Sequence, residues 1–281
     1  MWYGGVTLEN SVLFLGTGGD SLVVGKQIRA SGGIVLELEG NQFVLDPGPG
    51  CLVRARQADV SIRDTIAVLV SHSHTIHAND VNAVIEAMSV SGLDRIGVVV
   101  CNNKVANGDD KEAAVLKKRS WDFVEKVIIL EPGAKIGINN INIYTTKTKH
   151  FDSDAMGFIF ETPKYRIGYV GDTEYSDEVA DQFAKCGMLI LNVKYPSDLK
   201  GPGHLNVPDA VAFIKRAKPK LAVITHFGVK MLEADPIYQA REIQRQSNTE
   251  VIAAKDGLLI NPVSFSSRMR QSTLEPFSQS E

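Results

Sequence analysis

Short apolar runs, rich in β-branched residues and bounded by turn-forming residues, recur along most of the chain. Residues 65–70 (TIAVLV) are the clearest example and predict a buried strand. Similar runs predict strands at residues 11–15, 34–39, 43–45, 96–101, 127–130, 141–145, 156–161, 165–170, 186–193, 221–225, 251–254 and 258–260. A turn at Gly40–Asn41 would join 34–39 to 43–45 as a hairpin.

A different spacing predicts helices between these strands. Val81, Val84, Ile85 and Met88 recur at helical intervals, and Asn79 or Asp80 is placed to cap their helix. Helices are also predicted over residues 109–125, 207–218 and 234–247. Strands and helices are interspersed, which indicates a mixed α and β class. We expect one domain over residues 1–262, followed by a polar tail over 263–281 that is flexible or contacts a partner.

Composition narrows the classes of protein. The 281 residues are 44% hydrophobic and 22% charged, with a net charge of −3, which is ordinary for a globular protein. No strongly basic field is present to attract nucleic acid non-specifically. The three cysteines form no metal motif, no signal peptide is apparent, and no apolar run reaches the length of a membrane span. We therefore expect a cytoplasmic protein.

Histidines gather at the junction between the predicted strand 65–70 and the helix that follows. Three of the six in the chain, His72, His74 and His77, fall in the segment Ser71–Asp80. His72 and His74 face the same way in an extended chain, and His77 follows a turn. Imidazole nitrogens that converge in this way suit zinc, iron or manganese better than calcium or magnesium. The alternative is three solvated loop histidines, which the flanking core elements disfavour.

The other histidines also follow predicted strands or lie in loops. His150 and His226 each come after a strand, His204 lies in a Gly-Pro-Gly-His-Leu-Asn segment, and Asp172 ends a further strand. This pattern is typical of strand ends that surround one site. Residues 16–19 (GTGG) lack the ending of a phosphate-binding loop, so a structural turn is the better interpretation.

Taken in order, these motifs resemble the metallo-β-lactamase superfamily. The resemblance rests on His72-Ser-His74 and His77, on His150, on Asp172 in Gly-Asp-Thr, and on His226 in Thr-His-Phe-Gly. The Gly-His204-Leu-Asn segment is similar to the branch that contains the tRNA 3′-end-processing nuclease and related phosphodiesterases. The resemblance implies an α+β fold, a four-layer αββα sandwich with the site at one edge of two packed sheets.

The resemblance also implies roles for individual residues. The first metal would be bound by His72, His74 and His150, with Asp172 bridging to a second metal that also takes His77 and His226. His204 would lie beside the metals and bind the phosphate or protonate the leaving group, so His204 and Asp172 are the candidate catalytic residues. Asp46 and Asp256 would make structural hydrogen bonds beneath the site. Zn²⁺, as one or two ions, is the expected cofactor, with Mn²⁺ or iron as alternatives.

The chain departs from the family motif at one position. The motif His-x-His-x-Asp-His has isoleucine, Ile76, in place of its aspartate. Because isoleucine cannot bind a metal, the second site should be weakened and activity impaired. Asp80, about one helical turn further on, is a candidate substitute.

The leading hypothesis is a metal-dependent hydrolase of a phosphodiester or another small anionic ester, acting through attack of a metal-bound hydroxide. Two alternatives remain open: a mononuclear iron redox enzyme, and a catalytically degenerate member that binds a ligand. A small anionic substrate is the favoured partner, and nucleic acid is less favoured because the chain has no long basic, glycine-rich arm. We expect no membrane partner, and a homo-oligomer is possible.

Overall fold

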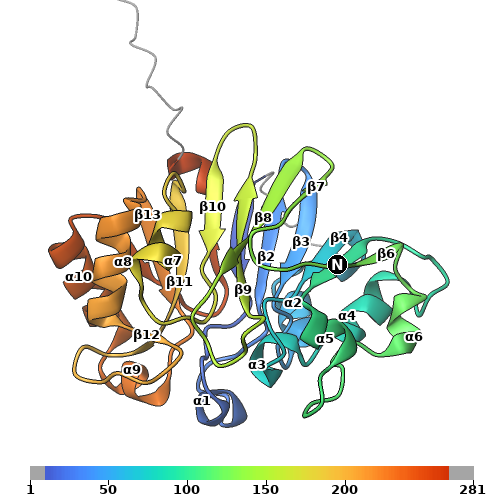
Figure 1. The fold of residues 1–281 in the computed structure, drawn as a ribbon, viewed down its shortest axis with the longest axis horizontal. Coiled ribbons are helices and arrows are strands. Elements are labelled where there is room, and N and C mark those ends of the chain that lie inside the picture. The colour runs from blue at the N-terminus through green and yellow to red at the C-terminus, as the bar shows by residue number, and fades with distance from the viewer. Residues whose placement is uncertain (1–9, 266–281) are drawn as a thin grey trace, which may run out of the picture.

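Four layers of secondary structure make up the protein, in a computed structural model that describes residues 10–265. Two mixed β-sheets pack face to face, and helices cover the outer face of each (Figure 1). The predicted αββα sandwich is therefore confirmed.

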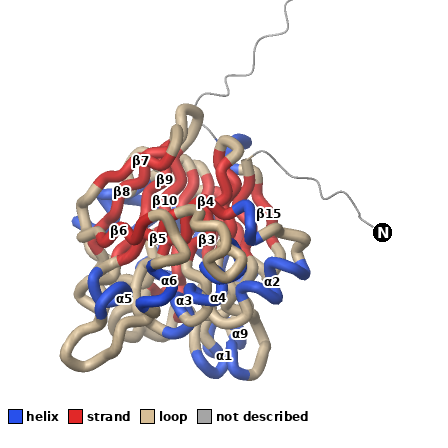
Figure 2. The backbone as a smooth tube through the Cα atoms, turned by 90° about the vertical axis from the view of Figure 1, so that its right-hand side faces the viewer, coloured by secondary structure: helices blue, strands red, loops and turns tan. Residues whose placement is uncertain are grey.

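The first sheet has the strand order β15-β1-β2-β3-β4-β5-β6. Its strands are β1 (Ser11–Phe14), β2 (Ile34–Leu38), β3 (Asn41–Leu45), β4 (Thr65–Leu69), β5 (Val98–Cys101), β6 (Lys126–Ile129) and β15 (Leu258–Ile260). The accompanying helices are α1 (Ser21–Gly25), α2 (Cys51–Gln57), η1 (Ile62–Asp64), α3 (Thr75–Ala78), α4 (Val81–Met88), α5 (Asn103–Asn107) and α6 (Lys118–Trp121). Figure 2 shows α2 to α6 together on this side of the molecule.

The second sheet has the order β14-β13-β11-β10-β9-β8-β7, and β12 pairs with β11. Its strands are β7 (Lys135–Ile138), β8 (Ile141–Lys147), β9 (Met156–Glu161), β10 (Arg166–Tyr169), β11 (Met188–Tyr195), β12 (Leu205–Asn206), β13 (Leu221–Thr225) and β14 (Glu250–Ala253). The helices on this side are α7 (Asp177–Gln182), α8 (Val207–Ala217), α9 (Val229–Glu233) and α10 (Pro236–Ser247). A short 3₁₀ helix, η2 (Pro262–Phe265), follows β15.

Strand β4 shows how the sequence pattern produces the layers. Ala67 and Leu69 point into the core between the sheets, where they join residues of the second sheet such as Phe158. Val68 points the other way and packs with Val84 of α4. Because successive side chains of a strand alternate between faces, a strand covered on both faces is apolar throughout.

Most of the predicted strands are confirmed within a few residues. In the β2–β3 hairpin, the turn consists of Glu39 and Gly40 rather than Gly40 and Asn41. Both turn residues have positive φ, 50° and 76°, as the two-residue type I′ turn requires. Residues 263–265 of the predicted tail belong to η2, and the remainder, 266–281, lies outside the described residues.

The predicted helix over residues 109–125 is wrong, since only Lys118–Trp121 is helical there. The Asp109 carboxylate accepts hydrogen bonds from the N–H groups of Lys111 and Glu112, both at 2.8 Å. Lys104 forms ion pairs with Asp109 and Glu112. Short polar side chains that bind nearby backbone N–H groups compete with helical hydrogen bonds, and here they hold a loop instead.

The carboxyl ends of several strands meet at one edge of the sandwich, the lower edge in Figure 1 near α1, α3 and α9. β4 leads into His72, β8 leads into His150, and β13 ends one residue before His226. β10 leads into Asp172 at the same edge. The fold therefore brings together side chains that are far apart in the sequence.

Candidate metal centre

The predicted metal ligands form two adjacent groups. The first is His72, His74, His150 and Asp172, and the second is His77, Asp172 and His226. In each group the candidate ligand atoms all lie within 4.8 Å of one another. Asp172 belongs to both groups, which is the arrangement that the resemblance implies for a bridging carboxylate. That these groups bind metal ions stays a prediction.

Asp172 lies at the centre of the cluster. Its Oδ2 is 3.8 Å from His72 Nε2, 3.3 Å from His77 Nε2, 3.2 Å from His204 Nε2 and 3.3 Å from His226 Nε2. Its Oδ1 accepts a hydrogen bond of 2.7 Å from Asn192 Nδ2. Asn192 therefore fixes the carboxylate so that one oxygen faces the imidazoles.

Hydrogen bonds on the far side of three imidazoles set which nitrogen faces the centre. His150 Nδ1 lies 2.8 Å from the carbonyl oxygen of Gly203, and His77 Nδ1 lies 2.9 Å from Asp46 Oδ2. A carbonyl oxygen and a carboxylate oxygen accept hydrogen bonds, so these Nδ1 atoms donate and Nε2 faces inward. Such partners orient metal-binding histidines in proteins.

His72 is oriented by a relay of two hydrogen bonds. The Ser71 hydroxyl donates to Asp46 Oδ2 at 2.7 Å, so its oxygen accepts from His72 Nδ1 at 2.9 Å. Asp46 also accepts from the Ser71 N–H and from the hydroxyl of Tyr169, at 2.7 and 2.6 Å. One buried carboxylate thus holds both His72 and His77. Sequence reasoning gave Asp46 a structural role but missed its contact with His77, and it missed Tyr169 and Asn192 entirely.

Burial makes most of the imidazoles poor bases. It lowers the pKa of His72 well below the ordinary value, and the nearby charge of His77 lowers that pKa further. Burial likewise lowers the pKa of His74 and of His150, and it lowers the pKa of His226 to about 4. Neutral imidazoles keep a nitrogen lone pair, which a metal ligand requires.

His77 and Asp172 form the charged part of the cluster. Burial alone would lower the pKa of His77, but the carboxylates of Asp172 and Asp46 raise that pKa to about 10. Burial alone would raise the pKa of Asp172, but its interactions with the imidazoles of His226 and His77 hold that pKa well below its usual range. Two buried carboxylates, Asp46 and Asp172, are stable here only beside a compensating positive charge. A proton on His77 or a metal cation can supply that charge.

The donor set fits a divalent transition metal. His74 Nδ1 lies 3.0 Å from His72 Nε2 and 3.3 Å from His150 Nε2, so three ring nitrogens face one another. His226 Nε2 is buried and, among the described residues, makes no hydrogen bond of acceptable geometry, although it lies 3.3 Å from Asp172 Oδ2. Imidazole and carboxylate ligands together suit Zn²⁺, Mn²⁺ or iron.

His204 approaches the centre from a separate loop. Its Nδ1 lies 3.0 Å from the carbonyl oxygen of Pro202, so Nε2 is the nitrogen that faces Asp172. The loop is tied down next to His204, because the Gly203 N–H donates to Glu174 Oε1 at 3.0 Å. His204 belongs to neither ligand group, and its role beside the metals stays a prediction.

Ile76 occupies the motif position where the family has aspartate. Its half-buried side chain lines a small cavity of ≈ 30 Å³ together with His77, His226 and Asp46. The proposed substitute, Asp80, is engaged elsewhere. Its Oδ2 accepts from the N–H groups of Gly50 and Cys51 at 2.9 and 3.0 Å and so caps α2. The structure therefore does not support Asp80, the candidate substitute, as a replacement for the missing ligand.

Asp80 is nevertheless the N-cap residue of α4, one of the two candidates that the sequence indicated, but its side chain makes no capping bond to that helix. Asp256, the other carboxylate expected to be structural, accepts from Thr17 Oγ1 at 2.7 Å and from the Ala30 N–H at 2.8 Å. Asp256 thereby supports the glycine turn at residues 16–19. Like Asp46, it makes structural hydrogen bonds.

Gly19 lets this turn approach His226. His226 has a φ of 64°, and a Cβ atom on Gly19 would lie 2.1 Å from its carbonyl oxygen. The two loops are also joined by hydrogen bonds from Phe227 N to Thr17 O and from Gly19 N to Phe227 O, at 2.8 and 2.9 Å. The turn therefore holds the His226 backbone in place.

Replacing Gly19 by alanine is expected to displace His226. Overpacking of this kind costs about 1–3 kcal/mol, so we expect a lower free energy of unfolding and a weaker second metal site, measured by thermal unfolding and by metal titration. Gly25→Ala is the matched control, because a Cβ there meets nothing within 4 Å. Equal metal affinity in both variants would contradict this role for the turn.

The fold and this site define a metallo-β-lactamase-type protein, and comparison with known proteins agrees. Residues 41–227 match the beta-lactamase superfamily domain. The uncharacterised protein MJ1374 of Methanocaldococcus jannaschii is 32% identical over 251 residues, which cover 89% of this chain and 94% of that protein. Ribonuclease Z of Methanopyrus kandleri is 23% identical over 287 residues, with 88% and 96% covered.

A solved structure supports the same fold. The metallo-beta-lactamase fold protein YhfI from Bacillus subtilis superposes with a TM-score of 0.75 at 19% identity, over 89% of this chain and 98% of that one. The chain therefore belongs to the beta-lactamase superfamily, whose members are metallohydrolases. Its relatives include ribonuclease Z, the branch that the Gly-His204-Leu-Asn segment predicts.

Proposed function

We propose that the protein is a metal-dependent hydrolase of a phosphodiester or another small anionic ester. The observation that carries this proposal is the position of Asp172 Oδ2, which is shared between two adjacent groups of histidine nitrogens. Two adjacent metal ions held by one carboxylate are typical of enzymes that hydrolyse phosphate esters. When bound, the metals would polarise the ester and lower the pKa of water.

The residues of the chain have separate tasks in this proposal. His72, His74 and His150 would hold one ion, His77 and His226 the other, and Asp172 both. Asn192 and Asp46 orient these ligands through the hydrogen bonds described above. His204, with Nδ1 bound to a carbonyl and Nε2 turned inward, would deliver a proton from Nε2 to the leaving oxygen.

Charge around the site favours a small substrate over a nucleic acid. Beside His74, the Ser73 hydroxyl contacts Asp152 Oδ2 at 3.2 Å and Glu112 Oε2 at 3.5 Å. Lys104 forms an ion pair with Glu112 at 3.0 Å, so Asp152 is the carboxylate at this point that would repel further phosphates of a polynucleotide. Within residues 10–265, the longest segment outside helices and strands is 108–117, so the described part of the chain has no long arm with which to grip RNA. None of the described helices is long and apolar enough to span a membrane.

The direct test combines metal analysis with a substrate panel. We expect at least one zinc, manganese or iron ion per chain in protein purified without added metal, and hydrolysis of bis(4-nitrophenyl) phosphate that chelation abolishes. Stoichiometric iron with a visible absorbance band and no hydrolysis would instead favour a redox enzyme. Full metal occupancy without turnover of phosphodiesters, carboxylic esters or RNA would favour a ligand-binding protein. RNA cleaved faster than every small diester would contradict the proposed substrate class.

Replacing His204 by alanine should have an effect that depends on the leaving group. General acid catalysis contributes about 10²–10⁴-fold, and it matters most when the leaving oxygen is strongly basic. We therefore expect a loss of this size for alkyl phosphodiesters and a much smaller loss for nitrophenyl esters, measured as kcat with metal occupancy unchanged. Leu199→Ala, at an exposed residue of the same loop, is the control. An equal loss with both kinds of ester would rule out proton donation by His204.

A further inference from the structure

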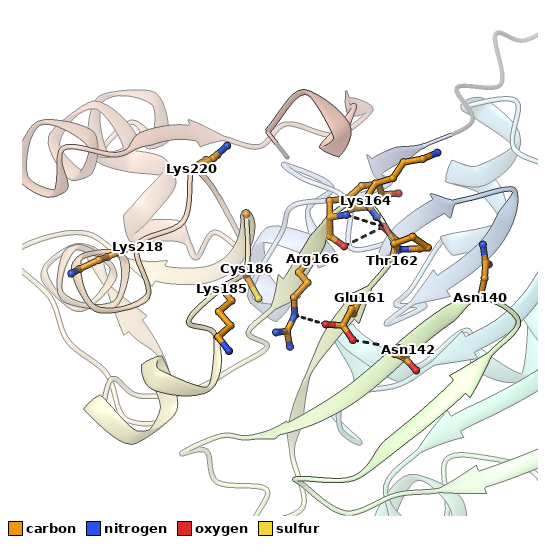
Figure 3. A pocket seen from close by; sticks show the side chains of 13 residues that line it. Asn140, Asn142, Glu161, Thr162, Lys164, Arg166, Lys185, Cys186, Lys218 and Lys220 are labelled. Carbon is orange, nitrogen blue, oxygen red and sulfur yellow. Dashed lines mark hydrogen bonds and ion pairs between the residues drawn. The ribbon is translucent and has the colours of Figure 1, made fainter. Parts of the chain in front are cut away.

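A second concave site lies at the end of the sandwich opposite the metal centre. This basic pocket has a volume of ≈ 660 Å³, and its lining includes Lys164, Arg166, Lys185, Lys218, Lys220 and Glu161. The cationic residues come from the β9–β10 turn, the start of β10, the α7–β11 loop and the α8–β13 loop (Figure 3). The metal centre uses none of them.

The basic pocket is far from the metal ligands because the two sites lie at opposite ends of the same strands. β13 begins just after Lys220 and ends just before His226. At about 3.3 Å per residue, the strand separates these two positions by about 20 Å. Backbone hydrogen bonds from Gly187 N to Arg166 O and from Lys220 N to Gly187 O join the three segments at the pocket. A ligand there would not reach the metal centre.

The charge in the basic pocket is unlike that of the whole chain, whose net charge is −3. Five cationic residues and a single carboxylate, Glu161, line the pocket. That carboxylate accepts from Tyr144 OH at 2.7 Å and from Asn142 Nδ2 at 3.3 Å, and its Oε1 lies 3.5 Å from Arg166 Nε. Glu161 therefore offsets mainly the charge of Arg166, and Lys164 forms an ion pair with Glu39 Oε2 at 3.0 Å. The charges of Lys185 and Lys218 are the ones that no carboxylate among the described residues offsets.

Two of these lysines occupy backbone conformations that disfavour them. Lys185 has a φ of 81° and Lys218, which ends α8, has a φ of 54°. Glycine or asparagine is usual at such positions, because a Cβ atom strains the left-handed conformation. Neither lysine side chain forms a hydrogen bond or ion pair within residues 10–265. Neither the backbone conformation nor a side-chain partner therefore explains why lysine is present at these two positions. The open pocket beside them offers an explanation, a ligand that the lysines bind.

We propose that the basic pocket binds a small anion that carries two or more phosphate groups, such as a nucleoside di- or triphosphate. A single phosphate would fill little of ≈ 660 Å³, whereas pockets of roughly 300–1,000 Å³ are usual for small ligands of nucleotide size. The cations come from several segments around the pocket, so they suit phosphates in a row. Glu161 and Asn142 add hydrogen-bond acceptors and donors for the uncharged part of the ligand.

The same phosphates could belong to a single-stranded RNA that crosses this face. A bounded hollow favours the small anion, because an extended polynucleotide needs a continuous basic groove. The negative charge of the whole chain also opposes binding of a long polyanion. RNA is therefore a competing outcome of the test.

The test is calorimetric titration of the full chain with ATP, inorganic tripolyphosphate and a single-stranded RNA oligonucleotide at low ionic strength. The central variant is the double substitution Lys185→Asn and Lys218→Asn, because asparagine tolerates the left-handed conformation. We expect unchanged or greater thermal stability and binding of ATP and tripolyphosphate weakened by about tenfold or more. Lys126→Gln with Lys215→Gln removes the same charge from exposed positions outside the pocket and should leave binding unchanged.

A separate variant distinguishes the basic pocket from the metal centre. His74→Ala should bind ATP and tripolyphosphate as the wild type does, whether or not the proposed hydrolase activity exists. Loss of binding in His74→Ala would place the ligand at the metal centre and overturn the proposal. It would also be overturned by undetectable binding to wild type, by equal weakening in the control double variant, or by RNA binding more tightly than either small ligand.

Discussion

Replacing His74 by alanine is expected to lower metal content and to reduce hydrolysis by at least about 100-fold, the upper range seen when even an indirect partner of a metal ligand is lost. His74 Nδ1 lies 3.0 Å from His72 Nε2 and 3.3 Å from His150 Nε2, so it completes the first ligand group. Without it, two imidazoles and the shared Asp172 carboxylate remain. Metal analysis and turnover of bis(4-nitrophenyl) phosphate measure the two effects.

Substitution of His74 should affect metal binding and hydrolysis without affecting the stability of the fold. His74 lies at the rim of the cluster, where its ring is partly covered by its neighbours but the residue as a whole is exposed, and its side chain makes no capping hydrogen bond to α3. The fold should therefore keep its stability, within the roughly 0.5 kcal/mol usual for surface substitutions. Thr75→Ala, at the next exposed residue, is the control. Wild-type turnover and metal content in His74→Ala would refute the assignment of the first ligand group.

Replacing Ile76 by aspartate is expected to strengthen the second metal site by at least about tenfold and to raise the turnover rate. Ile76 lines the small cavity beside His77 and His226, so a shorter carboxylate side chain there has room and lies next to the second group. The added negative charge would also favour a cation at a site that now has two imidazoles and a shared carboxylate. A calorimetric metal titration measures the affinity of the second site, and the initial rate at saturating metal measures turnover.

Ile76→Asn is the matched control, because asparagine has the shape of aspartate without its charge. If the carboxylate acts as a ligand, only the aspartate variant gains affinity. The same gain in both variants would mean that relief of packing by isoleucine, and not a new ligand, is responsible. No gain in either would show that this chain does not use the aspartate position of the family motif.

Much of the architecture could be predicted from the sequence because strand signals are local. The run at residues 156–161 coincides with β9, and the run at 221–225 coincides with β13. The short strand β7 was not predicted, since Lys135–Ile138 interleaves its two isoleucines with lysine and glycine at an edge of the sheet. The false helix over 109–125 had suitable local propensity, but side-chain hydrogen bonds and ion pairs with Lys104 decided that segment.

By itself, the sequence determined which side chains could bind a metal, because histidines and an aspartate at strand ends are visible in the order of the residues. Only the tertiary structure decided how they are held: Asp46 and Asn192 orient ligands that are distant along the chain, and Asp80 turns away to cap α2. The basic pocket was equally hidden, because its lysines come from separate loops that meet only when β10, β11 and β13 align. The physical reason is that periodicity and propensity act between near neighbours, whereas hydrogen bonds, burial and charge act between any residues that the fold places in contact.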